Sequence, residues 1–99
     1  MPPRRTQEVF RDELPRLLAE RGMSQRRLAA AVGLNQSYLT FVLKGQRAPS
    51  RRLLEGTAKE LGLAVDYFRE YREMVVIERV KSDPALLNRV YALVTRRSP

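Results

Sequence analysis

Glycines divide this chain into short segments that are rich in helix-forming residues. Gly22, Gly33, Gly45 and Gly62 each follow such a segment. Glycine is favoured just past a helix end because the chain turns left-handed there. No segment alternates between apolar and polar residues as a half-buried strand does. These features predict an all-α protein whose helices end at the glycines.

The residues that start the helices are also marked. Ser24, Asn35 and Ser50 are good N-cap residues, and Asp83 is a capping acid followed by a proline at the first helical position. Together with the glycines, these caps predict six helices, over residues 8–21, 25–32, 36–44, 51–61, 66–81 and 84–96.

Two residues inside the predicted helices are poor helix formers. Pro15 removes a backbone hydrogen bond and clashes with the carbonyl four residues earlier, so the first helix either starts near Asp12 or is kinked. In either case Phe10 would lie outside the helix or before the bend. Gly56 costs about 1 kcal/mol relative to Ala in a helix, which favours a role in a close helix crossing.

The composition lacks the usual parts of most enzymes and metal sites. The 99 residues include no Cys and no His, so thiolate ligands, imidazole ligands and the general base that titrates near neutral pH are missing. The acidic residues form no convincing pair for acid–base catalysis. We therefore expect no enzymatic activity, no metal and no cofactor.

Length and polarity are those of one globular domain. Apolar residues make up 43% of the chain and charged residues 30%, and no apolar run approaches the roughly 18 residues that a membrane span needs. No apolar run of signal-peptide length follows Met1. We therefore expect a cytoplasmic protein without a membrane partner.

The positive charge is concentrated in the first half of the chain. Residues 1–52 hold 11 basic and 4 acidic residues (+7), whereas residues 53–99 hold 8 and 7 (+1). Between Arg21 and Leu54 there is no acidic residue at all. Such a segment attracts a phosphate backbone or anionic lipid. A lipid partner is disfavoured because the arginines lie on helices whose apolar faces are needed for the core. An RNA partner is disfavoured because the chain has no aromatic platform on which bases could stack.

The segment from Ser24 to Gly45 predicts two short helices joined by a sharp corner. Ala29 is small enough for the helices to touch there, and apolar residues on both helices can share a core. With about 100° per residue, Leu39 and Val42 fall on one face of the second helix. The opposite face carries only neutral or positive hydrogen-bonding groups, as suits a helix that enters the major groove of DNA.

The sequence here resembles the helix-turn-helix domain of the phage Cro and repressor proteins and the Xre-type bacterial regulators. The resemblance covers about residues 10–70, and it is carried by Gln25, Leu28, Ala29, Gly33, Asn35, Leu39, Gly45, Pro49, Ala58, Leu61, Gly62, Asp66, Tyr67 and Phe68. It implies a five-helix lambda-repressor-like fold that binds operator DNA as a dimer with helix 36–44 in the major groove. Here the fold has an extended C-terminal helix and an additional last helix.

The resemblance also implies roles for single residues. Gln36 matches a base-reading position, and a glutamine can bond bidentately to adenine. Gln25 matches a phosphate contact that can brace Gln36. The other candidate base readers are Ser37, Thr40 and Phe41, although Phe41 is equally suited to packing against a neighbouring segment. The other candidate phosphate contacts are Asn35, Lys44, Gln46 and Arg47, to which Arg51 and Arg52 could add.

Two positions depart together from the family pattern. The family commonly has a partly buried Arg–Glu ion pair where this chain has Leu18 and Leu43. Replacing a buried ion pair by packed apolar residues is often neutral or stabilising, by roughly 1 to 4 kcal/mol. We expect Leu18 and Leu43 to touch.

The last thirty residues are more apolar than a DNA-binding domain of this size requires. We divide the chain into a basic arm (1–7), the helix-turn-helix domain (8–70) and a C-terminal helical extension (71–99). The extension has two apolar faces per helix, which predicts a homodimer formed through Met74, Ile77, Leu86, Val90, Leu93 and Val94. Alternatively these helices cap their own domain, or hold a different protein, as in an antitoxin or a restriction controller.

Overall fold

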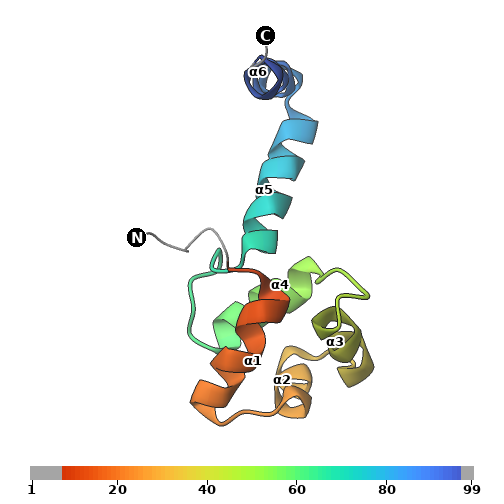
Figure 1. Ribbon diagram of the computed structural model, residues 1–99, viewed down its shortest axis with the longest axis vertical. Helices are drawn as coiled ribbons and strands as arrows, with labels where there is room; N and C mark the ends of the chain where they lie inside the picture. Colours follow the sequence, from red (N-terminus) through yellow and green to blue (C-terminus); the bar gives the residue numbers. More distant parts are fainter. Residues whose placement is uncertain (1–7, 97–99) are drawn as a thin grey trace.

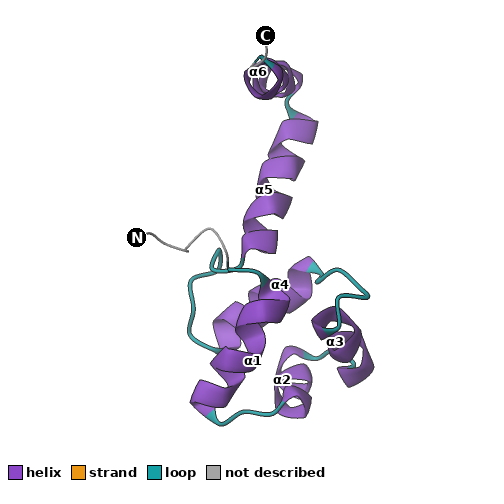
Figure 2. Ribbon diagram, viewed as in Figure 1, coloured by secondary structure: helices purple, strands orange, loops and turns teal. Residues whose placement is uncertain are grey.

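The computed structural model describes residues 8–96, and within them it contains six α-helices and no strand (Figures 1 and 2). The helices are α1 (Phe10–Arg21), α2 (Gln25–Val32), α3 (Gln36–Leu43), α4 (Arg51–Glu60), α5 (Arg69–Ser82) and α6 (Pro84–Thr95). The all-α prediction is confirmed. The proposed basic arm, residues 1–7, lies outside the described residues.

The predicted start and stop signals act as expected. The four glycines that follow predicted helices, Gly22, Gly33, Gly45 and Gly62, all have φ between 61° and 78°. The side chains of Ser24, Asn35, Ser50 and Asp83 accept hydrogen bonds from backbone N–H groups in the first turns of α2, α3, α4 and α6. Local chemistry therefore sets the bounds of these four helices, and the predicted ends of α3, α4 and α6 are long by one residue.

The predictions for α1 are wrong at its start. The helix begins at Phe10, not at residue 8 or near Asp12, and it continues through Pro15. Val9 at the N-cap offers no side-chain acceptor, but the carboxylate of Glu70 accepts the Phe10 N–H at 3.0 and 3.2 Å. Phe10 itself is completely buried. A distant carboxylate and a core aromatic therefore hold the first turn in place.

The helix predicted to begin at residue 66 begins instead at Arg69. Residues 65–66 form a turn, and the backbone carbonyls of Asp66 and Tyr67 accept hydrogen bonds from the Arg72 guanidinium, both at 2.8 Å. Phe68 is buried in the extended segment that precedes α5. This bent segment delivers Phe68 to the core, where its ring meets that of Phe10 edge to face at 4.9 Å.

The core lies among α1 to α4 and the segment that enters α5. Its buried residues are Phe10, Leu14, Leu17, Leu18, Leu28, Ala29, Leu39, Val42, Leu53, Leu54, Leu61 and Phe68. Leu18 is 5% exposed, and Leu43 is half-buried and packs against this cluster. Neither leucine is solvated, as we expected, and their direct contact stays a prediction.

Gly56 lies where α4 crosses α2. A Cβ atom at this position would be 2.6 Å from Cγ1 of Val32, which is closer than real carbon atoms approach. The prediction that Gly56 permits a close helix crossing is confirmed.

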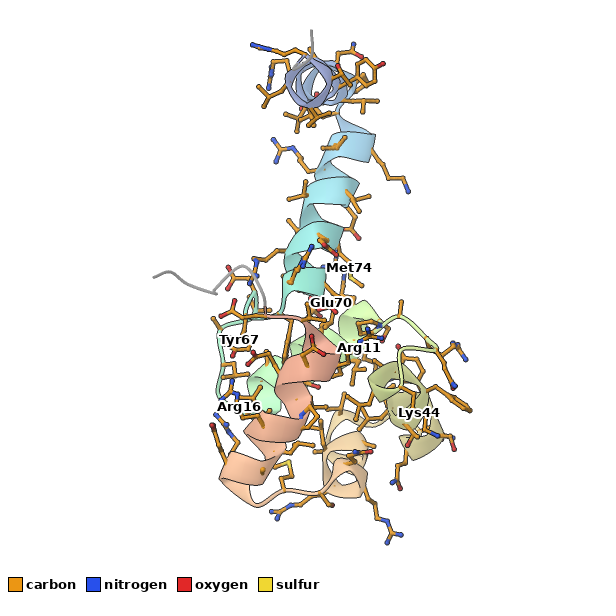
Figure 3. All side chains as sticks on the ribbon, in the orientation of Figure 1. Arg11, Arg16, Lys44, Tyr67, Glu70 and Met74 are labelled. Carbon is orange, nitrogen blue, oxygen red and sulfur yellow. The ribbon has the colours of Figure 1, made fainter. Side chains whose placement is uncertain are left out.

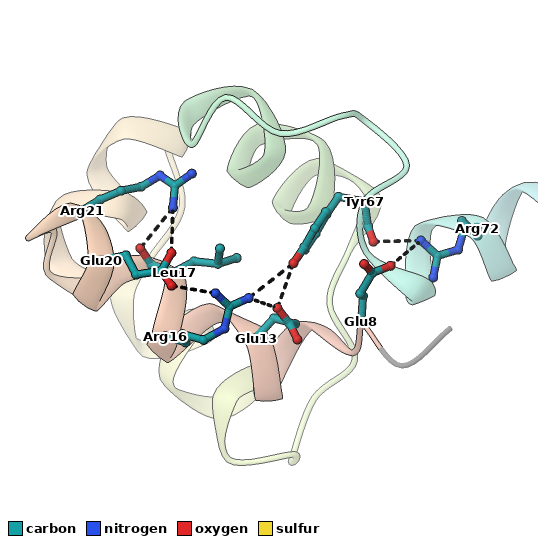
Figure 4. Close-up of polar contacts among 8 residues, drawn as sticks. All are labelled: Glu8, Glu13, Arg16, Leu17, Glu20, Arg21, Tyr67 and Arg72. Atoms are coloured by element: carbon teal, nitrogen blue, oxygen red, sulfur yellow. Dashed lines mark hydrogen bonds and ion pairs between the residues drawn. The ribbon is translucent and has the colours of Figure 1, made fainter. Parts of the chain in front are cut away.

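A polar network joins α1 to the segment before α5 (Figure 4). The Tyr67 hydroxyl donates to Glu13 at 2.8 Å, and Arg16 bonds Glu13 and Glu20 on its own helix. Partial burial works to raise the pKa of Glu13, but the hydrogen bonds from Tyr67 and Arg16 outweigh it, so the pKa is lowered from its ordinary value. Glu13 is therefore better ionised in the folded protein than in the unfolded chain.

The two C-terminal helices project away from the core. Figure 1 shows α5 running outward from the other helices and α6 lying across its far end. No residue of α5 or α6 is buried, and only Tyr71 and Met74, near the start of α5, pack against the core. None of the helices described is long and apolar enough to cross a bilayer.

Candidate nucleic-acid interface

Helices α2 and α3 meet at a tight corner formed by residues 33–35. Gly33 has φ of 78°, a left-handed conformation that favours glycine, and the guanidinium of Arg52 lies beside it. The following Leu34 N–H donates to the Ala29 carbonyl at 2.9 Å. Ala29 is 2% exposed in the core. The corner therefore presents α3 at a fixed angle to α2.

The two faces of α3 are divided as the sequence predicts. Leu39 and Val42 are buried, whereas Gln36 and Ser37 are exposed and Thr40 is partly exposed. The exposed groups are amides and hydroxyls, which both donate and accept hydrogen bonds. The outward face of α3 can therefore match the edges of base pairs.

Phe41 belongs to the exposed part of α3. Its side chain is 42% exposed and it does not join the core. This exposure is compatible with both possibilities left open by the sequence, contact with a base and packing against a neighbouring segment. An exposed aromatic at this place can meet an apolar group such as the methyl of thymine.

The first turns of α2 and α3 carry Gln25 and Gln36. Both side chains are exposed, and no hydrogen bond joins them in the described part of the chain. That Gln25 braces Gln36 stays a prediction. Asn35 uses its side-chain oxygen to accept the Ser37 N–H at 2.7 Å. Its amide NH₂ group is the part left for a phosphate.

The loop between α3 and α4 carries three exposed candidates, Lys44, Gln46 and Arg47. Tyr38, which the sequence analysis did not identify, fastens this loop. Its hydroxyl donates to the Ala48 carbonyl at 2.9 Å and accepts the Ser50 N–H at 2.7 Å, and its ring lies 5.6 Å from the Arg47 guanidinium. A tyrosine between the polar and apolar faces of a helix is a signal for such a role, because its tip seeks a polar partner.

Arg51 and Arg52 each contact other groups of the protein. Arg51 pairs with Glu55 and with Glu78 of α5, and it lies 5.5 Å from the ring of Tyr71. The hydrogen bond to Glu78 and its charge raise the pKa of Arg51. Arg52 donates to the Gly33 carbonyl at 3.1 Å. That both arginines add to the phosphate contacts stays a prediction.

The residues predicted to form a dimer interface are divided between two environments. Met74 is half-buried against the protein's own core, which accounts for at least part of its apolar surface. Ile77, Leu93 and Val94 are exposed, at 54%, 67% and 64%. Leu86 and Val90, both in α6, are half-buried. Val76, Leu87 and Tyr91 extend the same exposed apolar surface.

In the described part of the chain, no three acidic residues are grouped in a way that could hold a metal ion. The interface is instead built from amides, hydroxyls, cations and one aromatic ring. Such groups bind phosphates and base edges without chemical change.

Comparison with known proteins agrees with this geometry. A family model described as helix-turn-helix matches residues 16–68, which is more than half of the chain and includes α2, α3 and α4 completely. Comparisons with curated proteins and with solved structures found no match. The matched range, together with the corner between α2 and α3, shows that this chain belongs to the Cro/C1-type helix-turn-helix family of DNA-binding regulatory proteins.

Proposed function

We propose that this protein regulates transcription as a homodimer that reads a dyad-symmetric operator, with α3 in the major groove of each half-site. One observation carries the proposal. The outward face of α3 exposes hydrogen-bonding groups, and the segment from Arg21 to Leu54 that contains it has no acidic residue. A polyanion can therefore approach this face without repulsion.

Gln36 and its neighbours on α3 would read the bases. Gln36 is exposed at the start of α3, where a bidentate pair to an adenine edge is within the reach of a glutamine. Ser37 and Thr40 would accept or donate single hydrogen bonds, and Phe41 would contact a thymine methyl. Each good bidentate pair contributes about 1–3 kcal/mol of discrimination against the wrong base.

The phosphate contacts would flank α3 on both sides. Gln25 and the amide of Asn35 lie at the starts of α2 and α3, and Lys44, Gln46 and Arg47 follow the end of α3. Contacts on both sides of the recognition helix fix its register along the duplex.

The exposed apolar side chains of α5 and α6 would form the dimer interface. A second copy of the chain could cover Ile77, Leu93 and Val94, which its own domain leaves in solvent. A two-fold axis through this interface would separate the two recognition helices by about one turn of DNA, roughly 34 Å.

Selection from a random duplex library tests the DNA-reading part. We expect a dyad-symmetric consensus in the retained fraction and a steep loss of affinity with salt. Gln36→Ala should relax one base pair in each half-site, whereas Gln46→Ala should weaken binding without changing the consensus. Retention without any consensus would contradict sequence-specific reading.

Light scattering across a range of protein concentrations tests the dimer. Leu93→Asp should produce a monomer, and the control Val65→Asp, at an exposed valine outside α5 and α6, should leave the wild-type mass unchanged. A monomeric wild-type protein that still selects a consensus would contradict the homodimer. It would favour a different protein as the occupant of α5 and α6, as in an antitoxin or a restriction controller.

A further inference from the structure

Arg11 lies in the first turn of α1, yet its guanidinium reaches the loop that follows α3. The group rests against the backbone of Gly45 so closely that a Cβ atom at that glycine would collide with it. Figure 3 shows Arg11 on the side of α1 that faces α3, and Lys44 is the C-cap residue of α3. The contact joins residues that are distant in the sequence, so no local pattern reveals it.

No acidic group neutralises Arg11 in the described part of the chain. Glu70 also lines this groove, but both of its oxygens accept the Phe10 N–H, and no ion pair links it to Arg11 among the described residues. Lys44 and Arg47 also have no acidic partner among the described residues. Three exposed cations from two separate elements therefore surround one short loop.

The groove beside this loop is lined mainly by donors and apolar groups, and Glu70 is the one carboxylate among its lining residues. Arg11, Gln46 and Arg47 line it with donors, and Val9, Ala48 and Pro49 add apolar surface. An arginine guanidinium matches the oxygens of a phosphate in pairs and is weakly hydrated. The groove adjoins the C-terminal end of α3, where the DNA backbone borders the major groove in the proposed complex.

We propose that Arg11 binds a DNA phosphate and so positions the start of α1 against the backbone beside the Lys44 to Arg47 loop. This inference rests on the proposed function and adds a contact from α1 to those made by α2, α3 and the loop. Gly45 is explained by its φ of 78°, and the lack of a side chain there leaves room for the Arg11 guanidinium beside the loop.

The test measures how the affinity of the full chain for a mixed-sequence duplex of about 30 base pairs changes with salt. Arg11→Gln should lower the slope of log affinity against log salt by about 0.9, and weaken binding roughly five- to tenfold at low salt, for each bound copy of the chain, because each copy loses one phosphate contact. Arg11→Lys should restore the slope but recover only part of the affinity, since a lysine cannot bind in a bidentate manner.

Lys59→Gln is the matched control. It removes one exposed positive charge near the end of α4, away from the groove. Thermal unfolding of each variant confirms that the fold is retained. If Arg11→Gln and Lys59→Gln have the same slope and affinity, the proposal is overturned while the proposed function stands. If the wild-type protein binds the duplex without any dependence on salt, the proposed function itself fails.

Discussion

The carboxylate of Glu70 accepts the backbone N–H of Phe10 through both of its oxygens, at 3.0 and 3.2 Å, although the two residues are 60 positions apart. Glu70 also lies in the first turn of its own helix, α5. A single negative charge therefore stands at the N-terminal ends of two helices, where each helix dipole favours it. The start of α1 and the start of α5 are thereby tied together.

Glu70→Gln should lower the free energy of unfolding by about 1 kcal/mol, because the amide keeps one acceptor but loses the charge. Glu70→Ala should cost about 2 kcal/mol, since no acceptor remains for the Phe10 N–H. Urea unfolding measures both values. Glu73→Gln, which removes an exposed carboxylate paired only with Arg69 on the same helix, should change stability by less than about 0.5 kcal/mol. Equal effects at positions 70 and 73 would show that the Phe10 contact contributes nothing.

Gly56→Ala should destabilise the protein by about 1–2 kcal/mol, despite the gain of about 1 kcal/mol in helix propensity. The reason is the close approach of Val32, whose Cγ1 would lie 2.6 Å from the new Cβ. Adding Val32→Ala should relieve the clash, so the double variant should be more stable than the two single effects predict. A complete double-mutant cycle measures this coupling. Additive effects would mean that the two helices move apart freely.

Thr57→Val should raise the free energy of unfolding by about 1 kcal/mol. The Thr57 hydroxyl oxygen is completely buried, and it has no hydrogen-bond partner among the described residues. Valine has nearly the same shape and removes this unpaired polar group. Thr57→Ser keeps the hydroxyl and loses a methyl group, so it should be destabilising by a similar amount. Thermal unfolding of the three proteins decides, and a less stable valine variant would reveal a partner for the hydroxyl.

Stability should fall in acid through Glu13. Its pKa is lowered in the folded protein, so its contribution is fully present above the ordinary glutamate pKa of about 4.3 and is lost as the pH falls through the lowered folded value. Glu13→Gln should reduce this loss of stability, so that the free energy of unfolding falls less steeply in acid (the acid limb). Tyr67→Phe, which removes one of the hydrogen bonds that lower the pKa, should reduce it partly. Urea unfolding between about pH 2 and 7 measures the limb. An unchanged limb in Glu13→Gln would contradict the prediction.

Stability should also fall at alkaline pH, through Tyr67. Burial and the hydrogen bond to Glu13 raise the pKa of Tyr67, so the stability it contributes is present below the ordinary tyrosine pKa of about 10 and is lost as the pH rises through the raised value. Tyr67→Phe should remove this alkaline loss of stability while costing about 1 kcal/mol at neutral pH for the lost hydrogen bond.

Features that depend on neighbouring residues could be predicted from the sequence. Glycines with positive φ and capping side chains act within four residues of a helix end, so the bounds of α2, α3 and α4 follow from local chemistry. The division of α3 into an apolar and a polar face follows from helical periodicity in the same way. Gly56 was also identified correctly, because a glycine inside a helix has few reasons other than close packing.

Features that depend on distant contacts could not be predicted. The start of α1 at Phe10 requires Glu70, and the bend before Arg69 requires the Arg72 guanidinium and the burial of Phe68. The contact of Arg51 with Glu78 of α5 could not be predicted either, because the two residues are 27 positions apart. Tyr38 and Arg11 were missed for the same reason, since their partners in the loop after α3 are brought to them only by the tertiary fold.

Within the residues the structure describes, the two projecting helices pack against the core only near the start of α5, through Tyr71 and Met74. Beyond Met74, no residue of α5 or α6 is fully buried, and among the described residues Arg51 with Glu78 is the one ion pair that links this part to α4. Substitutions there can accumulate with little cost to folding. Descendants of such a chain could therefore exchange one association partner for another while their recognition of DNA stayed the same, provided that the segment from Phe68 to Met74 was inherited unchanged.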